Sequence, residues 1–261
     1  MTTEPARALV TGVRRGIGHA VVSQLLADGM KVAGTVRDPA DFKQSWNGYV
    51  ELVAADATNQ DETTSAVNEA AAALGGLDVV VANAGRGSTG SALTADEGDW
   101  HDQTSNKMLT VTNLVSAVLT YLKQSDRPRI IVIGGVTALS PDDGQGVVSA
   151  MRAAQLNLVV NLANRLAGDG ICVNTVLLGA IATDRQREKF KASGADDYDQ
   201  WVVDEVARRG IPFGRFGTAE EVAALVGFLA SEHSGYITGA AIPISGGLGN
   251  LAGGMGSPFH Y

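Results

Sequence analysis

A glycine-rich stretch near the amino terminus has the composition of a phosphate-binding turn. The sequence TGVRRGIG at 11–18 places glycines at Gly12, Gly16 and Gly18. It lies between an apolar run at 7–12, which predicts a buried strand, and a segment whose apolar residues recur at helical spacing. Glycines in this context allow a tight turn and let the backbone approach a pyrophosphate at the positive end of the helix. The stretch therefore predicts a dinucleotide site.

Short apolar runs, which predict strands, alternate with longer segments of helical periodicity. Strands are expected at 7–12, 31–37, 50–56, 77–85, 129–135, 171–179 and 240–244. Helices are expected from about residue 17 to Gly29, and at 60–74, 100–123, 147–167 and 218–230. This alternation predicts an α/β fold with a doubly wound parallel sheet, right-handed crossovers and helices on both faces. No repeat or linker divides residues 1–261, so we expect one Rossmann-type domain with a polar insertion at 184–209 and a glycine-rich tail at 246–261.

Composition narrows the class of protein. The chain has 261 residues, 45% of them hydrophobic, and a formal net charge of −8 with no basic tract, which argues against nucleic acid as a partner. Its single cysteine, Cys172, excludes an intrachain disulfide and a multi-cysteine metal site, and we expect no bound metal. No run reaches the roughly 18 apolar residues of a membrane span. The amino terminus has no signal pattern, so we expect a cytoplasmic protein.

Three motifs together resemble one known family over nearly the whole chain. They are TGVRRGIG at 11–18, NAG at 83–85, and GRFGTAEEVAALVGFLASEHSGYITGAAIPISGG at 214–247. They resemble the TGxxxGIG motif, the NNAG motif and the carboxy-terminal signature of the short-chain dehydrogenase/reductase family. Ala82 replaces the first asparagine of NNAG. The resemblance implies a nicotinamide-dependent oxidoreductase on a Rossmann-type fold.

The resemblance also implies a set of cofactor-binding residues after the expected strands. They are Gly12, Arg14, Arg15, Gly16, Ile17, Gly18, Arg37, Asp56, Ala57, Asn83, Ala84, Gly85, Ile181 and Thr183. In the family, the acidic residue matched by Asp56 contacts adenine, and the positions of Ile181 and Thr183 touch the nicotinamide carboxamide.

The basic residues in this set favour NADP(H) over NAD(H). Proteins that prefer NAD carry an acidic residue at the end of the second strand, where it binds the ribose hydroxyls. Here that position is Val36, followed by Arg37, and Arg14 and Arg15 precede the second glycine. Guanidinium groups bind phosphate in a forked geometry, so these arginines predict recognition of the 2′-phosphate of NADP(H).

The catalytic positions of the family are all changed. The family uses a tyrosine acid, a lysine four residues later on the same helical face, a serine and an asparagine. Counting along this chain puts Val148 at the tyrosine position, Arg152 at the lysine, Gly135 at the serine and Lys107 at the asparagine. A shift of one residue would put Asn106 at the last position. No Tyr-x-x-x-Lys pattern occurs anywhere in the chain.

Two of the replacements keep a positive charge, and we take Arg152 and Lys107 as the candidate catalytic residues. Val148 cannot donate a proton, and a guanidinium, with a pKa above about 12, is too weak an acid near neutrality. Arg152 can still bind the ribose, while Lys107 could serve as an acid if burial lowers its pKa. The alternative is that both are surface or subunit-interface charges. Tyr198 and Tyr261 are the other candidate proton donors.

Three functions remain open at this point. We expect an NADP(H)-dependent carbonyl (keto) reductase that works without the tyrosine acid, with an acidic hydroxyl of the substrate as one source of the proton. The first alternative is a catalytically silent subunit in a hetero-oligomer with an active relative. The second is a non-redox cyclase, epimerase or lyase, in which Lys107 and Arg152 would stabilise an oxyanion.

Two segments indicate the partners. The polar insertion 184–209 is expected to form a lid over a small-molecule substrate. The apolar helix 147–167 matches an interface helix of the family, which implies a homotetramer or homodimer, or a hetero-oligomer with an active family member.

Overall fold

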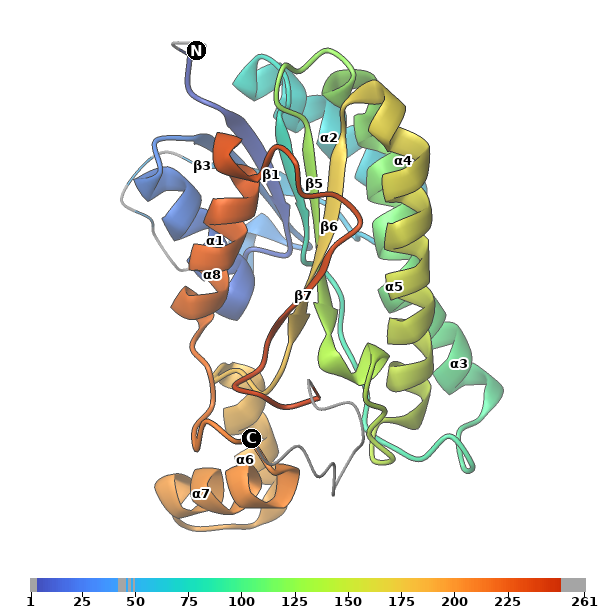
Figure 1. Cartoon of the computed structure of the whole chain (residues 1–261), viewed down its shortest axis with the longest axis vertical. Coiled ribbons are helices and arrows are strands. Elements are labelled where there is room, and N and C mark those ends of the chain that lie inside the picture. The colour runs from blue at the N-terminus through green and yellow to red at the C-terminus, as the bar shows by residue number, and fades with distance from the viewer. Residues whose placement is uncertain (1–3, 42–45, 47, 49, 250–261) are drawn as a thin grey trace.

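The computed structural model describes residues 4–41, 46, 48 and 50–249, and these form one parallel sheet with helices on both faces (Figure 1). The strands are β1 Arg7–Thr11, β2 Lys31–Val36, β3 Val50–Ala54, β4 Val79–Ala82, β5 Arg129–Gly135, β6 Cys172–Leu178 and β7 Ala241–Ile244. Their order is β3-β2-β1-β4-β5-β6-β7, and all pairs are parallel. The chain changes direction across the sheet between β1 and β4, which is where open α/β sheets bind their ligands. The predicted fold class is confirmed.

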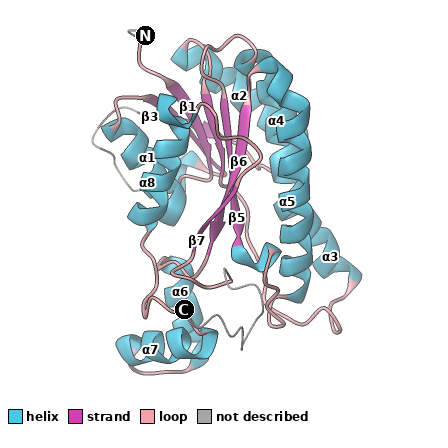
Figure 2. Cartoon of the chain, in the orientation of Figure 1, coloured by secondary structure: helices cyan, strands magenta, loops and turns pink. Residues whose placement is uncertain are grey.

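Two helical layers cover the sheet (Figures 1 and 2). One face packs against α1 Gly16–Ala27 and α8 Ala219–Ala230, and the other against α2 Gln60–Leu74, α4 Thr110–Leu122 and α5 Gly146–Leu166. Alternate residues of the central strands enter opposite cores, because side chains alternate across a strand. Leu9 and Val80 lie in the core beneath α2, α4 and α5, while Val10 and Val81 lie beneath α1 and α8.

Beyond the carboxyl ends of the strands lie α6 Asp184–Ser193 and α7 Tyr198–Arg209, which coincide with the polar insertion expected at 184–209 (Figure 1). Each helix ends at a glycine with positive φ, Gly194 at +73° and Gly210 at +61°. Trp201, Val206 and Phe216 form a small core beneath α7. A lid function of these two helices stays a prediction. The tail residues 250–261, including Tyr261, lie outside the described residues, so any role of the tail also stays a prediction.

The helix predicted at 100–123 is divided by a wider turn. It begins earlier, as α3 Glu97–Thr104, because Asp96 and Asp99 form a reciprocal capping box at its start. A π-helical turn, η2 Ser105–Leu109, then leads into α4. Such turns leave carbonyl groups outside the regular ladder and are frequent at functional sites. This one contains both Asn106 and Lys107.

The other expected elements agree with the structure to within a few residues at each end. The strand expected at 77–85 is shorter in the structure, where β4 spans Val79–Ala82. The pairing of β4 with β5 stops at Ala82, and the chain then turns away from the sheet. Short 3-10 turns occur at η1 Pro39–Asp41, η3 Val136–Ala138, η4 Ala167–Asp169 and η5 Glu232–Ser234. Among the described residues, none of the helices combines the length and apolar character needed to cross a bilayer.

Candidate active site

The turn between β1 and α1 has the geometry of a phosphate-binding loop. Gly12 and Gly16 have φ of +72° and +59°, which favour glycine. A Cβ at Gly18 would collide with the carbonyl oxygen of Gly12, so the helix can approach the strand only with glycine there. Arg15, at the start of α1, makes no side-chain cap. The first amide groups of the helix therefore lack a capping side chain and are suited to bind an anion.

Thr11, the last residue of β1, and Asn83, which follows the neighbouring strand β4, hold this turn in place. The Asn83 Nδ2 donates to the carbonyl oxygens of Thr11 at 2.9 Å and Gly12 at 3.0 Å. The Thr11 hydroxyl oxygen accepts from the amides of Asn83 and Ala84, both at 3.0 Å. The NAG segment thus fixes the shape of the glycine turn through these hydrogen bonds.

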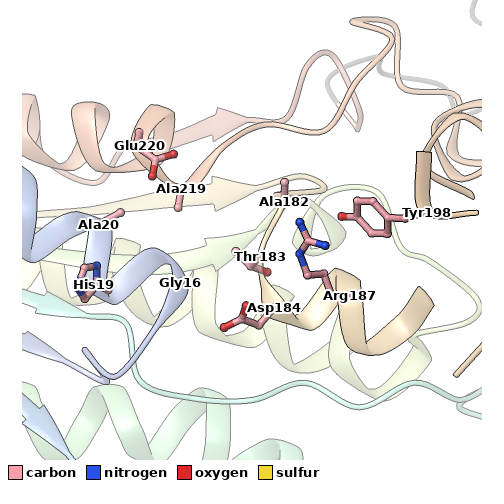
Figure 3. Close-up of a pocket in the computed structure, with 10 residues that line it drawn as sticks. All are labelled: Gly16, His19, Ala20, Ala182, Thr183, Asp184, Arg187, Tyr198, Ala219 and Glu220. Carbon is pink, nitrogen blue, oxygen red and sulfur yellow. The ribbon is translucent and has the colours of Figure 1, made fainter. Parts of the chain in front are cut away.

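A cavity of about 580 Å³ opens beside the turn (Figure 3). It is lined by Gly16, His19, Ala20, Ala182, Thr183, Asp184, Arg187, Tyr198, Ala219 and Glu220. His19 stacks on Trp46 with ring centroids 4.9 Å apart, and its buried Nε2 has no hydrogen-bond partner among the described residues. Burial lowers the pKa of His19, so this ring is neutral near pH 7. An unpaired buried nitrogen beside an uncapped helix start fits a polar ligand such as a dinucleotide.

Arg15, which the sequence predicts to face the cofactor phosphate, binds two carboxylates of α6 in this structure. Its Nη1 lies 2.8 Å from Glu188 Oε1 and 3.9 Å from Asp184 Oδ2. All three side chains are about half exposed, so the pairs are worth only about 0–1 kcal/mol. An arriving phosphate can therefore compete for Arg15 at little cost.

Arg37 and Asp56, which follow β2 and β3, lie near each other. Arg37 is exposed directly after β2, and the carboxylate of Asp38, the next residue, accepts a hydrogen bond from the amide of Ala40 at 2.9 Å. Asp56 accepts from the hydroxyl and amide of Thr58, at 2.7 and 2.9 Å, and these bonds and the charge of Arg37 lower its pKa. Asp56 is thus ionised, with Arg37 close enough to affect it.

Val148 and Gly135 lie near the edge of the sheet where the strands end, outside the residues that line this cavity. Val148 is buried in the first turn of α5, and Gly135 ends β5. A Cβ at Gly135 would lie 3.1 Å from Arg152 Nε, so this glycine makes room for the arginine. The Arg152 Nη1 donates to the carbonyl oxygen of Ile133 at 3.1 Å and to Gln155 Oε1 at 3.4 Å. Arg152 is therefore folded against the end of β5 and does not project from the helix surface.

Lys107 is buried inside the π-helical turn, with only 2% of its surface exposed. Its Nζ donates to the carbonyl oxygen of Arg86 at 2.6 Å. Burial, reinforced by the positive charges of Arg152 and Arg185, lowers the pKa of Lys107 to about 6. Gln155 donates to the Lys107 carbonyl oxygen at 2.9 Å, which links this turn to Arg152. The reading of Lys107 as a surface charge is wrong.

Asn106, the alternative at the asparagine position, faces a different way. Its Nδ2 donates to the carbonyl oxygen of Asp102 at 2.9 Å, and its Oδ1 accepts from the amide of Arg86 at 3.2 Å. Its own carbonyl oxygen accepts from the Thr110 hydroxyl at 3.1 Å. Asn106 thus holds the loop after β4 through the amide of Arg86, whereas Lys107 contacts the same loop through the carbonyl oxygen of Arg86.

Arg185 was expected only as part of the polar insertion 184–209 and not as a site residue. It extends from α6 and donates from Nη2 to the carbonyl oxygen of Gly87 at 3.2 Å. A Cβ at Gly87 would touch both Arg185 and Val148, so Arg185 lies beside the position where the family has its tyrosine. Burial and the charge of Arg209 lower the pKa of Arg185. The only signal in the sequence is the abundance of basic residues in 184–209.

Comparison with known proteins identifies the family. The family model described as Enoyl-(Acyl carrier protein) reductase matches residues 12–249. The chain is 32% identical over 253 residues to the 3-oxoacyl-[acyl-carrier-protein] reductase FabG of Salmonella typhimurium, which covers 95% of this chain and 99% of the relative. This chain belongs to the short-chain dehydrogenase/reductase family. It is also 32% identical to an acetoacetyl-CoA reductase of Acinetobacter, over 94% of this chain and 98% of the relative.

Solved short-chain dehydrogenase/reductase structures share the fold. One is a short chain oxidoreductase from Pseudomonas aeruginosa described as containing an atypical catalytic center, with 30% identity and a TM-score of 0.89 over 95% of this chain and 98% of that one. Its NADPH-bound form gives a TM-score of 0.88 at the same identity and coverage. YwfH, an NADPH dependent reductase involved in bacilysin biosynthesis, is 27% identical with a TM-score of 0.85, over 96% and 100% of the two chains.

Proposed function

We propose that this member of the family is an NADP(H)-dependent carbonyl reductase in which Lys107 donates the proton. The observation that carries the proposal is the burial of Lys107 in the π-helical turn, where its Nζ contacts the loop that follows β4. A Cβ at Gly85, the last residue of the NAG motif, would lie 3.8 Å from the Lys107 Nζ. The NADPH-bound relative with an atypical catalytic center supports this choice of cofactor.

The cofactor-binding residues proposed are those of the glycine turn and the loops that follow the strands. Gly12, Gly16, Ile17 and Gly18 would hold the pyrophosphate against α1. Arg14, Arg15 and Arg37 would hold the 2′-phosphate, and Asp56 and Ala57 the adenine. Asn83, Ala84 and Gly85 would support the turn and the ribose, and Ile181 and Thr183 the carboxamide. The uncapped start of α1 and the unpaired Nε2 of His19 fit this assignment.

Bound NADPH supplies a hydride to the carbonyl carbon of the substrate. The developing negative charge on the carbonyl oxygen is then stabilised by Arg152 and Arg185, because positive charges in a buried site act without the screening of water. Protonated Lys107 gives one proton to that oxygen and completes the alcohol, and a proton from solvent restores it. With a pKa of about 6, Lys107 is a stronger acid than an ordinary lysine and is matched to a reaction near neutral pH.

Positively charged side chains would also stabilise an enolate. A non-redox reaction is therefore one of the outcomes that the test distinguishes. The test incubates the purified chain with NADPH or NADH and a panel of aryl ketones, quinones and oxoacids, and follows both cofactor oxidation and product formation. The proposal predicts NADPH oxidation in a one-to-one ratio with the alcohol, and a slower reaction with NADH. Product without net oxidation would favour the cyclase, epimerase or lyase. Tight NADPH binding with no product from any substrate would favour the silent subunit.

A further inference from the structure

Three basic side chains lie near one another at the edge of the sheet where the strands end, and none has a carboxylate partner among the described residues. Lys107, Arg152 and Arg185 donate to the carbonyl oxygens of Arg86, Ile133 and Gly87 respectively. No carboxylate of the described residues lies within ion-pair distance of any of the three. Buried charges in proteins are ordinarily paired, because removing an ion from water is costly. An unbalanced cluster of this kind is stabilised when it receives an anion.

The acids nearest to the cluster are already bound to other arginines. Asp102 accepts from Arg86 Nη2 at 2.6 Å. Glu205, on α7, lies 2.7 Å from both Arg208 and Arg209. Glu188 binds Arg15. The chain thus neutralises the surrounding arginines and leaves the charge of the cluster available.

The three basic groups are held close together by backbone groups of neighbouring elements. Arg86 and Gly87 are consecutive residues, so Lys107 and Arg185 are held at neighbouring carbonyl groups of one loop. Arg152 is held at the end of β5, the strand next to β4, and Gln155 joins it to the Lys107 backbone. Guanidinium groups bind a carboxylate through two parallel hydrogen bonds. Two guanidinium groups and one amine therefore suit a planar carboxylate with a carbonyl beside it.

We propose that the substrate is an oxoacid, whose carboxylate binds Arg185 and Arg152 and thereby directs the adjacent carbonyl oxygen to Lys107. This inference rests on the proposed reductase function and specifies its substrate class. It differs from what the printed names of the relatives describe, since those proteins reduce acyl groups attached to a carrier protein or to coenzyme A. It also gives α6 a direct part in specificity through Arg185.

The charge of the anion would also assist the proton transfer. An anion beside Lys107 favours its protonated form and opposes the effects of burial and of the charges of Arg152 and Arg185, which lower the pKa of this lysine. Asp102 is the acid that acts on Lys107 in the opposite direction, and its effect is the smallest. Substrate binding would thus favour uptake from solvent of the proton that Lys107 gives to the carbonyl oxygen.

The experiment compares short 2-oxoacids and 3-oxoacids with their methyl esters, which keep the reacting carbonyl and lack the negative charge. For the unaltered protein, kcat/KM should be higher for the acid than for its ester. In Arg185→Met, the ratio of acid to ester should fall by about 10- to 100-fold, the loss expected for hydrogen bonds between charged groups. Lys191→Met is the matched control, because Lys191 is an exposed cation on the same helix, and it should keep the ratio of the unaltered protein.

A second measurement separates this inference from the proposed function. The affinity of the oxoacid for the chain loaded with NADP⁺ is measured by calorimetry, which needs no turnover. Binding that weakens about 10-fold or more in Arg185→Met, and is absent for the ester, supports the oxoacid site even if no NADPH is oxidised. Equal kcat/KM or equal affinity for acid and ester would overturn the inference while leaving the reductase function intact. Circular dichroism and thermal unfolding confirm that each variant is folded.

Discussion

Lys107 is the residue on which the proposed chemistry depends. The family has its lysine on the helix that corresponds to α5. Here the lysine, Lys107, lies in the π-helical turn, and Arg152 on α5 donates to the carbonyl oxygen of Ile133. The wider turn brings the Nζ against the carbonyl oxygen of Arg86, where burial lowers its pKa to about 6. The position of the amine, and not its place in a motif, is what makes it a candidate acid.

Replacing this amine should abolish most of the activity and leave the cofactor bound. We expect Lys107→Met to lower kcat/KM by about 10²- to 10⁴-fold, the usual contribution of a general acid, while the Kd for NADPH changes little. Steady-state kinetics and a fluorescence titration measure the two quantities. Lys123→Met is the control, because Lys123 is an exposed lysine at the end of α4. A variant with unchanged kcat/KM would remove Lys107 from the mechanism.

The same residue should make stability depend on pH in a defined direction. Its pKa falls from an ordinary value of about 10.4 to about 6 on folding, so the unfolded chain binds more protons between these values. The free energy of unfolding contributed by this group therefore rises with pH from about 6 toward 10, by up to about 1.4 kcal/mol per pH unit. Denaturant titrations at several pH values should show this rise in the unaltered protein and a weaker one in Lys107→Met. Parallel curves for the two proteins would contradict the lowered pKa.

At the residue scale, local patterns were predictable and long-range contacts were not. Gly12, Gly16 and Gly18 could be found because one short turn sets their spacing. Arg185 meets Gly87 across 98 positions of sequence, and no periodicity records such a contact. The pairing of Arg15 with α6 was hidden for the same reason.

At the scale of elements, α6 contacts both the glycine turn and the loop after β4. Glu188 on this helix binds Arg15 of the glycine turn, and Arg185, one turn earlier, reaches the loop after β4. The expected bounds of α2 at 60–74 and of β5 at 129–135 agree with the structure, because their apolar patterns end at clear turn residues. The division of 100–123 by η2 could not be predicted, since a π-helical turn leaves no mark on the apolar spacing.

The ion pair at Arg15 leads to a prediction about cofactor choice. In Glu188→Gln, Arg15 loses the shorter of its two ion pairs, keeps only the 3.9 Å contact with Asp184, and is more available to the 2′-phosphate. We expect NADPH to bind more tightly, by up to about fivefold given the modest worth of an exposed pair, and NADH affinity to stay the same. Glu69→Gln, an exposed change on α2, provides the control for net charge. If the affinities for NADPH and NADH rise equally, Arg15 does not recognise the 2′-phosphate.

At the scale of the whole molecule, the sheet brings all parts of the site to one edge. The glycine turn, the NAG segment and the end of β5 follow β1, β4 and β5, which are neighbours in the sheet. The molecule carries a net charge of −8, yet Arg152 and Arg185 lie at this edge without a carboxylate partner among the described residues, so an anionic substrate is attracted there and not to the general surface. The predicted layers follow from apolar periodicity, whereas this charge distribution depends on the folded chain.

We also expect the chain to form a homo-oligomer by itself. Leu109 and Val160, on η2 and α5, are 41% and 40% exposed, and Phe228 and Tyr236 are more exposed still. Exposed apolar side chains on helical faces are suited to contact a second copy. Light scattering of the purified chain should give the mass of a dimer or tetramer, and Val160→Asp should shift it toward smaller species. A monomer at micromolar concentration would argue for assembly with another chain.

The most direct test of the account follows the hydride itself. The chain is incubated with an oxoacid and NADPH carrying deuterium at the transferred position of the nicotinamide ring, and the product is examined by mass spectrometry. The proposed mechanism predicts one deuterium on the carbon of the new alcohol for each NADPH consumed, and about 10²- to 10⁴-fold slower formation of this labelled alcohol by Lys107→Met at the same concentration. Alcohol that contains no deuterium, or an oxoacid converted without oxidation of NADPH, would contradict it.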